Sequence, residues 1–332
     1  MNLKNIFLFI FFLFTILEAQ EQFNSIASQP GSFSRMGFAA RGKSMGNALG
    51  AVVNGNVDVY YNPALSVYQD RNSFHTAYSF LSLDRKLNFL SFTKKFELGK
   101  SDSLRKNKFK PTAGLAIGLI NSGVSNIDER DNQGFKTGSL SVFENQFFLN
   151  LALKISNKIS FGLNAKFYYS KIYKDITSTT LGFDVGAIYK FSENFYSAIV
   201  IKDINSKYKW DSSKLYGLDG VTIEEKFPVL KKISASYNFS EINLLVAAEV
   251  ESSSFGTNVF RLGAEYSIIN NLRFRGGIDY INLSNFDTPI RPAFGLEYNY
   301  TLSVFDFSFQ YAFAFEPYSE FDQHIIGISI NF

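Results

Sequence analysis

Polar and apolar residues alternate along most of the chain after Ser73. The clearest case runs from residue 159 to residue 169, where every second position is apolar or aromatic and most of the others are small or polar. A period of two places these sets on opposite faces of a β-strand, whereas a helix repeats every 3.6 residues. The pattern therefore predicts an all-β fold over residues 73–332.

Fourteen such segments are expected, each close to the ~9–11 residues that a tilted strand needs to cross a membrane. They are predicted at 73–81, 86–96, 112–121, 143–154, 158–169, 178–190, 194–203, 228–239, 241–251, 257–268, 271–281, 290–300, 302–313 and 321–332. An even number of antiparallel strands brings both ends of the chain to the same side of the membrane.

The predicted connections alternate in length. Tight turns are expected at Ser156-Asn157, Ser192-Glu193, Ser240, Ile269-Asn270 and Thr301, and longer loops at about 122–142, 170–177, 204–227, 252–256, 282–289 and 314–320. Short periplasmic turns and long external loops are typical of a transmembrane β-barrel with 14 antiparallel strands. Residues 97–111, with five Lys or Arg, are long where a short turn is expected and are interpreted only as a solvated basic turn.

Both ends of the chain indicate export. Residues 1–20 carry Lys4, the apolar run Ile6–Leu17 interrupted only by Thr15, and a small-residue cleavage pattern at Ala19, which predicts a signal peptide. At the other end the last predicted strand stops on Phe332, the kind of terminal residue that barrel-insertion machinery recognises. We therefore expect the mature protein in the outer membrane of a Gram-negative bacterium, with the lipids and the insertion machinery there as partners.

Composition removes several function classes. The chain has no Cys, which excludes disulfides, thiolate metal sites and a Cys nucleophile. Its 37 Phe and 18 Tyr suit strands and interfacial aromatic girdles. Residues 1–20 hold one Lys and one Glu, so their removal leaves the net charge at +3, and no nucleic-acid partner is expected.

Charged residues alternate with apolar ones in the later strands. Inside lipid the charged face must point into the barrel. The predicted luminal charges are Glu249, Arg261, Glu265, Arg273, Arg275, Asp279, Glu297 and Asp306. Leu262, Tyr266 and Leu296 belong to the opposite face. Because both signs are interleaved, the pattern favours an ion-pair lattice that fills the lumen over a selectivity ring of one sign.

Residues 21–72 do not alternate and contain six glycines between Gly31 and Gly55. A segment so irregular is unsuited to lipid, so we expect it to fold inside the barrel as an N-terminal hatch or plug, ahead of the barrel at 73–332.

The stretch Ala40–Ala48, followed by Asn62-Pro63-Ala64 sixteen residues after Gly46, resembles the start of the FadL (OmpP1/TodX) superfamily of outer-membrane barrels. Within it the chain looks most like the PorV/PorQ family, which opens with Ala-Arg-Ala-x-x-Met-Gly-x-Ala and reaches Asn-Pro-Ala. The matching motif positions are Arg41, Met45, Gly46, Asn62, Pro63 and Ala64. The sequence departs from the family at Asn54-Gly55, where an acidic pair is common, and at Leu65, where a Gly is expected. The resemblance implies a fourteen-stranded barrel with a hatch.

Structural roles are favoured for the hatch motif. Pro63 fixes its own φ and pushes Asn62 toward extended geometry, so the tripeptide is expected to set the turn from hatch to strand. Arg41 is expected to bind a luminal carboxylate, Glu265 or Glu297.

An enzymatic role is not expected. His75 and His324 fall in the first and last strands, which are neighbours in a closed barrel, but no metal-ligand motif or nucleophile accompanies them. No catalytic residue, cofactor or metal is predicted. Trp210 lies in the long loop at 204–227 with other apolar residues, which we interpret as covering the barrel mouth or contacting lipopolysaccharide rather than binding a ligand.

Two functions stay open at this point. The PorV/PorQ resemblance implies a protein of type IX secretion that binds or tethers exported proteins with type IX sorting domains. The wider FadL resemblance implies transport of long-chain fatty acids or other hydrophobic small molecules across the outer membrane.

Overall fold

The computed structural model describes residues 26–98 and 109–332. The predicted signal peptide at 1–20, the first residues of the predicted hatch and most of the basic turn at 97–111 lie outside the described residues. In the described ranges no helix is long and apolar enough to cross a membrane.

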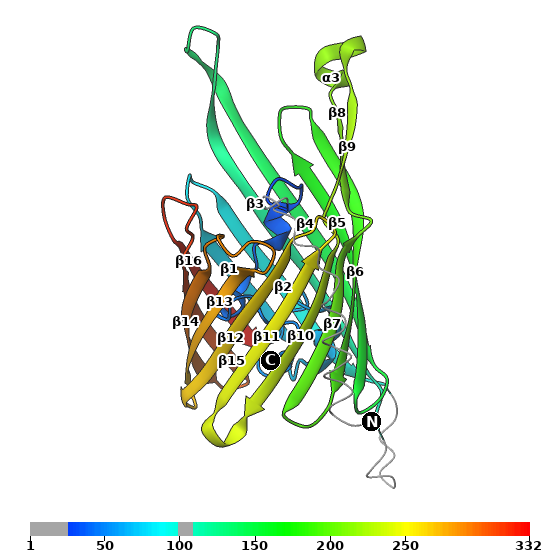
Figure 1. Ribbon diagram of the computed structural model, residues 1–332, viewed down its shortest axis with the longest axis vertical. Coiled ribbons are helices and arrows are strands. Elements are labelled where there is room, and N and C mark those ends of the chain that lie inside the picture. The colour runs from blue at the N-terminus through cyan, green and yellow to red at the C-terminus, as the bar shows by residue number, and fades with distance from the viewer. Residues whose placement is uncertain (1–25, 99–108) are drawn as a thin grey trace.

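Fourteen antiparallel strands of the described chain close into one barrel (Figure 1). Consecutive barrel strands pair, and β7 pairs with β10 because β8 and β9 form a separate hairpin. The first and last strands close the cylinder, with Ser73 opposite Asn331 and Phe80 opposite His324. The barrel strands are β1 (Ser73–Phe80), β2 (Lys86–Glu97), β3 (Thr112–Arg130), β4 (Lys136–Lys154), β5 (Ile159–Lys171), β6 (Thr177–Lys190), β7 (Phe195–Ile204), β10 (Leu230–Phe239), β11 (Leu244–Ser253), β12 (Asn258–Ile269), β13 (Leu272–Asn282), β14 (Arg291–Leu302), β15 (Phe305–Ala314) and β16 (Gln323–Asn331).

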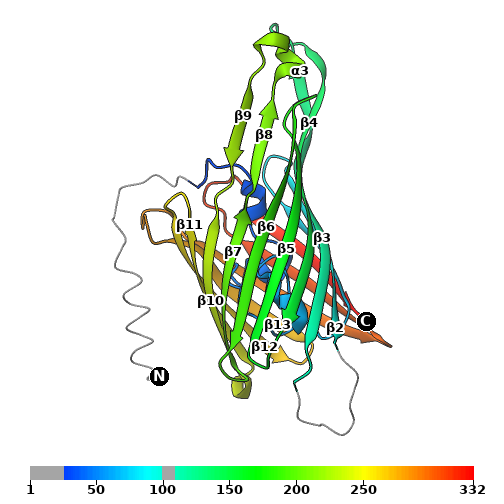
Figure 2. The ribbon, with the colours of Figure 1, turned by 90° about the vertical axis from the view of Figure 1, so that its right-hand side faces the viewer.

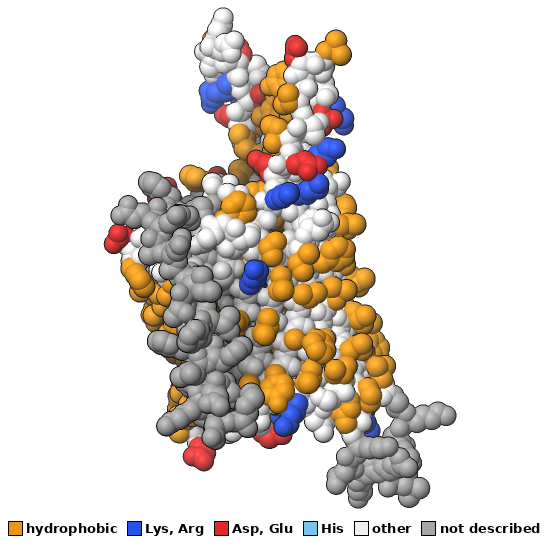
Figure 3. Space-filling model, turned by 45° about the vertical axis from the view of Figure 1, so that its right-hand side comes forward, with side chains coloured by type: hydrophobic (Ala, Val, Ile, Leu, Met, Phe, Trp, Pro, Cys, Tyr) orange, Lys and Arg blue, Asp and Glu red, His pale blue; other side chains and the backbone are white. Residues whose placement is uncertain are grey.

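The wall is apolar outside and polar inside. Alternate side chains on each strand are exposed or buried, as in β5, where Phe161 and Leu163 face out while Asn164 and Lys166 are buried. Figure 3 shows hydrophobic side chains spread over the visible wall, with charged ones gathered where the wall meets the projecting ribbons. This is the surface that a lipid-facing barrel requires.

Connections differ between the two ends of the barrel, as predicted. At one end of the barrel, called the inner end here, short turns join neighbouring strands, for example β12 to β13 across Asn270 and Asn271. The opposite end is the outer end. At the outer end β3 and β4 run for 19 residues each and form a ribbon that stands clear of the wall (Figures 1 and 2).

The prediction of a loop at 122–142 was therefore wrong. Pairing of β3 with β4 continues past the wall, with Val124 opposite Val142 and Ile127 opposite Leu140. Most side chains of the ribbon's upper part are exposed on both faces, so no buried face imposes the alternation that marks the strands below.

The expected loop at 204–227 also holds regular structure. Strands β8 (Lys207–Asp211) and β9 (Thr222–Lys226) form a hairpin whose tip carries the short helices α3 (Ser213–Tyr216) and η3 (Gly217–Asp219). Figures 1 and 2 show this hairpin projecting from the barrel, and β8 contacts β6. The indole Nε1 of Trp210 donates a hydrogen bond of 2.8 Å to Glu225 Oε2 at the hairpin.

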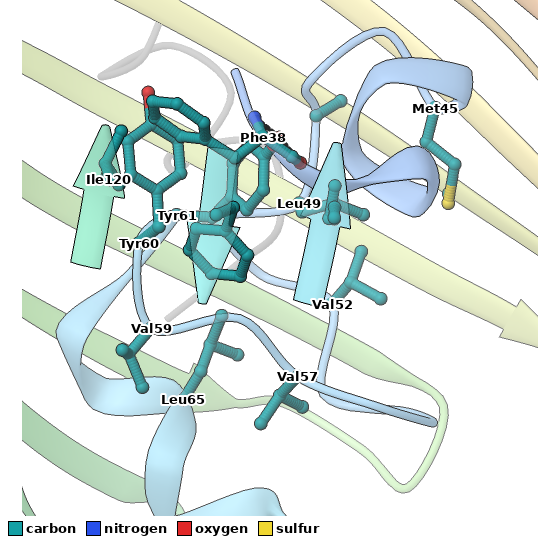
Figure 4. Close-up of a cluster of buried hydrophobic side chains, with 14 of the residues drawn as sticks. Phe38, Met45, Leu49, Val52, Val57, Val59, Tyr60, Tyr61, Leu65 and Ile120 are labelled. Atoms are coloured by element: carbon teal, nitrogen blue, oxygen red, sulfur yellow. Dashed lines mark hydrogen bonds between the residues drawn. The ribbon is translucent and has the colours of Figure 1, made fainter. Parts of the chain in front are cut away.

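The described hatch residues, 26–72, pack inside the barrel and form three short helices, η1 (Ser32–Arg35), α2 (Ala39–Ser44) and η2 (Pro63–Tyr68). Helix α2 contacts β13–β16 and β1, and η2 contacts β2–β6, so the two ends of the hatch lie against opposite parts of the wall. Figure 4 shows the apolar residues that it brings together. The ring of Phe38 packs edge-on against Tyr60, with 4.5 Å between centroids, and stacks on Phe89 of β2.

Candidate functional site

The hatch motif at Met45 and Gly46 lies against a part of the wall that is made of glycine. A Cβ on Gly263 would lie 2.3 Å from Met45 O, and a Cβ on Gly277 would lie 2.3 Å from Gly46 N. Gly46 itself has φ +57°, and its own Cβ would meet the carbonyl oxygens of Leu262 and Ile278 at 2.6 Å. Only glycine on both surfaces allows this backbone approach. We call this contact the Met45 seat.

Asn62-Pro63-Ala64 occupies a second glycine surface on the other side of the lumen. Cβ atoms on Gly162 of β5 and Gly186 of β6 would lie 2.2 Å from Pro63 C and 2.1 Å from Asn62 Oδ1. The Asn62 carboxamide also caps η2, accepting from Ala64 N at 2.9 Å, and donates to Gly50 O at 2.8 Å. The tripeptide therefore both starts the helix and fixes it to the wall. We call this contact the Pro63 seat.

Arg41 joins the hatch to the luminal charges. Its Nε donates to Glu265 Oε2 at 2.9 Å, which is one of the two pairings expected. Its Nη1 donates to the carbonyl oxygens of Asn54 and Asn56, both at 2.7 Å. Glu265 also accepts from Arg275 Nε at 2.6 Å. One guanidinium thus holds a wall carboxylate and a turn of the hatch together.

The chain of charges continues from Arg275 to Glu297, which also binds Arg273. A second network holds Arg261 among three carboxylates, with 2.7 Å between its Nε and Asp279 Oδ1 and 3.3 Å between Nη1 and Glu249 Oε1. Lys232 and Glu251 complete it. Because these buried charges are mutually paired, they fill the lumen without leaving one sign in excess.

Sequence reasoning missed a third buried cluster, Lys166 with Asp184 and Asp203. Lys166 Nζ lies 2.6 Å from Asp184 Oδ1 and also binds Asp203, which accepts from Tyr168 OH at 2.6 Å. Lys166 and Asp184 do occupy the polar face of predicted strands. Asp203 could not be assigned to this cluster from the sequence. The pairing of β6 with β7 shifts register between Phe183 and Val185, and Asp203 has φ +61°.

Two predicted residues lie apart from the interior networks. Asp306 binds Arg71 at the inner rim, where the two side chains are 36% and 39% exposed, so it is not part of the buried lattice. Phe332 lies on the outer surface between Phe92 and Phe305, with ring centroids 6.4 and 6.0 Å away. Its role as an insertion signal stays a prediction.

The two histidines do not come together. His75 points inward, with Nδ1 3.4 Å from Asp58 Oδ2, while His324 is on the outer face, with Nδ1 2.7 Å from Tyr311 OH. Over the described ranges, no group of three or more His, Asp or Glu residues is arranged to hold a metal ion.

Burial sets the protonation of the hatch tyrosines. Removal from water raises the pKa of both Tyr60 and Tyr61, so their hydroxyls stay neutral at physiological pH. Tyr60 OH donates to Ser34 O at 2.8 Å, and Tyr61 OH lies 2.7 Å from Asn47 Oδ1. These neutral hydroxyls link the start of the hatch to its centre.

A cavity of about 160 Å³, the outer cavity, lies between η1 and the upper parts of β3 and β4. Six of its lining residues are apolar and two are charged. The lining comprises Ser32, Phe33, Met36, Leu81, Arg85, Ser122, Gly123, Val124, Val142, Phe143 and Glu144. A groove of about 380 Å³ shares Gly123, Val142 and Phe143 with it and is also lined by Asn121, Asn145 and Tyr169. The lining of the outer cavity therefore mixes six apolar side chains with two hydroxyl groups, two charged groups and one glycine.

A second cavity, the inner cavity, lies at the end of the barrel with the short turns. It measures about 240 Å³ and is mostly polar. Its lining is Asn54, Gly55, Asn238, Ser240, Asn243, Leu245, Glu265, Ser267 and Arg273. The buried body of the hatch separates the two cavities.

No protein-family model matches the sequence, and no curated protein matches it. Solved structures do match. The toluene transporter TodX of Pseudomonas putida has a TM-score of 0.58 and 14% identity, with 89% of this chain and 96% of that chain covered. The monoaromatic hydrocarbon channel CymD has a TM-score of 0.55 and 16% identity, with 93% and 97% covered.

A Pseudomonas aeruginosa FadL homologue also matches, with a TM-score of 0.53 and 11% identity over 89% of this chain and 98% of that one. At such identities the likeness establishes the fold alone, a closed 14-stranded antiparallel barrel. This confirms the predicted fold class. The closer resemblance to the PorV/PorQ family stays a prediction.

Proposed function

We propose that the protein is an outer-membrane channel that takes up hydrophobic small molecules, the second of the two functions considered from the sequence. The fold it shares with TodX and CymD supports this, since those structures are described as a toluene transporter and a monoaromatic hydrocarbon channel. No catalytic step and no cofactor belong to this proposal.

The outer cavity is the observation that carries the proposal. Ligand sites typically combine apolar walls with a small number of polar groups, and the outer cavity sets Phe33 and Val142 beside Arg85 and Glu144. An apolar cavity of about 150 Å³ is large enough to hold benzene. At about 160 Å³ the outer cavity fits a compact ring compound better than an extended fatty acid.

Uptake measurements test this function. The protein is expressed in a Gram-negative host whose outer membrane limits entry of toluene, and the initial rate of toluene uptake is compared with that of cells carrying an empty vector. The proposal predicts faster uptake of toluene than of a long-chain fatty acid at equal concentration. Equal rates with and without the protein would contradict it.

A second candidate is the binding of exported proteins, as the PorV/PorQ resemblance implies. The observation that favours it is the pair of ribbons beyond the wall, whose tips expose Phe135, Tyr216 and Leu218. Affinity purification of the intact protein from its native membrane tests it. Recovery of proteins with type IX sorting domains, lost when residues 213–220 are replaced by Gly and Ser, would support this role.

A further inference from the structure

The outer cavity contains two opposite charges, and each of them is bound to a different group. Arg85 and Glu144 both line the cavity, and the remaining lining consists of apolar side chains, two serine hydroxyls and a glycine. Arg85 is exposed and Glu144 is half-buried. Within the described chain these two side chains form no ion pair with each other. A ligand in this cavity therefore meets both a hydrogen-bond donor and an acceptor.

Glu144 is held in position by the projecting hairpin. On β4 it shares the inward face with Gln146, and it lies opposite Ser122 of β3. Its Oε1 accepts a hydrogen bond of 2.9 Å from Tyr208 OH of β8. Tyr208 is itself buried, and its ring packs edge-on against Phe227 with 4.8 Å between centroids. A carboxylate accepts several hydrogen bonds, so Glu144 can bind Tyr208 and a ligand together.

Arg85 comes from the tight turn between β1 and β2. Leu83 and Asp84 have φ +61° and +54°, the backbone geometry of a two-residue hairpin turn. The Arg85 Nε then donates to Ser82 O at 3.1 Å, which fixes the guanidinium beside this turn. Its Nη1 and Nη2 carry further N–H donors. The turn therefore supplies the cavity with a positive charge that is anchored at one nitrogen only.

These two charges discriminate between classes of ring compound. A cationic ligand would gain Glu144 but meet Arg85, and an anionic ligand would gain Arg85 but meet Glu144. A neutral hydroxyl serves both, because it donates to a carboxylate and accepts from a guanidinium. At about 160 Å³ the outer cavity has room for one benzene ring beside Phe33 and Val142.

We infer that the outer cavity binds phenols, which are neutral ring compounds with one hydroxyl. Glu144 is the specificity-determining acceptor for that hydroxyl, and Tyr208 is the positioning residue that orients the Glu144 carboxylate. This inference rests on the proposed function and names the substrate class of its site.

A pair of solutes that differ by one hydroxyl tests the inference. Dissociation constants of p-cresol and toluene are measured by titration of the protein in lipid nanodiscs, with empty nanodiscs as the reference. Glu144→Leu removes the acceptor, so the affinity for p-cresol falls about tenfold while that for toluene changes by less than about twofold. Glu144→Gln keeps the shape and gives a smaller loss, again for p-cresol alone. Glu129→Leu removes a carboxylate of the β3–β4 ribbon outside the cavity and is the matched control.

The outcomes separate this inference from the channel function. Unchanged affinity for p-cresol in Glu144→Leu, or equal loss of both solutes in the Leu and Gln variants, overturns the assignment while toluene binding by the wild type keeps the channel function standing. Wild-type protein that binds neither solute overturns both. The folded state of each variant is checked by the heat-dependent shift of the barrel in gel electrophoresis.

The role of Tyr208 has its own test. Tyr208→Phe removes the donor that orients Glu144 but keeps the packed ring, so the affinity for p-cresol falls about threefold and that for toluene stays at the wild-type value. Tyr216→Phe, at the exposed tip of the same hairpin, is the control. Wild-type discrimination in Tyr208→Phe would remove Tyr208 from the assignment.

Benzylammonium tests the charge argument. It is similar in size to p-cresol but positively charged, so Arg85 makes its binding to the wild type weaker than that of p-cresol. Arg85→Met narrows this difference because the repelling charge is gone. Tighter binding of benzylammonium than of p-cresol by the wild type would overturn the choice of phenols.

Discussion

The two cavities on either side of the hatch differ in chemistry more than in size. The outer cavity has Phe33, Met36, Val142 and Phe143 in its wall, whereas the inner cavity is lined mainly by Asn, Ser and charged groups. An apolar solute gains transfer free energy in the first and little in the second. Under the proposed channel function, selection of the solute therefore belongs to the outer end and its release to the inner end.

The hatch between the cavities is held by close backbone contacts with wall glycines as well as by apolar packing. Replacement of Gly162 by Ala places a Cβ 2.2 Å from the backbone of Pro63, which displaces the Pro63 seat. Overpacking of this kind costs about 3 kcal/mol. We expect this largest effect as a lowered transition temperature in detergent, measured by circular dichroism. Gly276→Ala, whose Cβ would meet only Phe294 at 3.8 Å, is the matched control and should melt like the wild type.

Filling the outer cavity should leave no room for the solute there and so lower its uptake. Val142→Trp occupies the space beside Val124, and we expect uptake of toluene to fall roughly tenfold, equivalent to about 1.4 kcal/mol. Leu149→Trp on the same strand faces outward and is the control. Wild-type uptake by the Val142→Trp variant would place the solute path elsewhere.

Narrowing the inner cavity should slow release without changing selection. Ser267→Trp adds bulk to its lining, and we expect uptake to fall about threefold while affinity for toluene at the outer cavity stays at the wild-type value. Affinity is measured by titration of the protein in lipid nanodiscs. A joint loss of affinity and uptake would show that the two cavities do not act separately.

The smallest effect is expected at the inner rim. Arg71 and Asp306 are both more than a third exposed, and such ion pairs contribute about 0.5 kcal/mol. Arg71→Met should therefore leave both the transition temperature and uptake nearly unchanged. A large loss of either would give this rim pair a role in closing the inner end.

Much of the barrel could be predicted because lipid and lumen impose a period of two on each strand. The predicted segments match the observed strands within a few residues, apart from the outer parts of β3 and β4. Those parts and β9 escaped prediction because their side chains lie mostly in solvent on both faces, where no alternation is required. β8 does alternate, but it is only five residues long.

The candidate site was predicted only in part. The inward direction of Arg261, Glu265 and Glu297 follows from alternation, but partners across the lumen depend on register and bulges, as Asp203 shows. The Pro63 seat could not be predicted from the sequence, because Gly162 and Gly186 form one surface only when β5 and β6 are paired. The outer cavity likewise needs η1 of the hatch to be placed against the β3–β4 ribbon.

The position of a bound solute tests the central claim most directly. Crystals of the protein soaked with bromobenzene should give an anomalous bromine peak in the outer cavity, between Phe33 and Val142, and crystals of Val142→Trp should lack it. A bromine peak confined to the inner cavity or to the lipid-facing wall, with the outer cavity free of solute, would contradict the account.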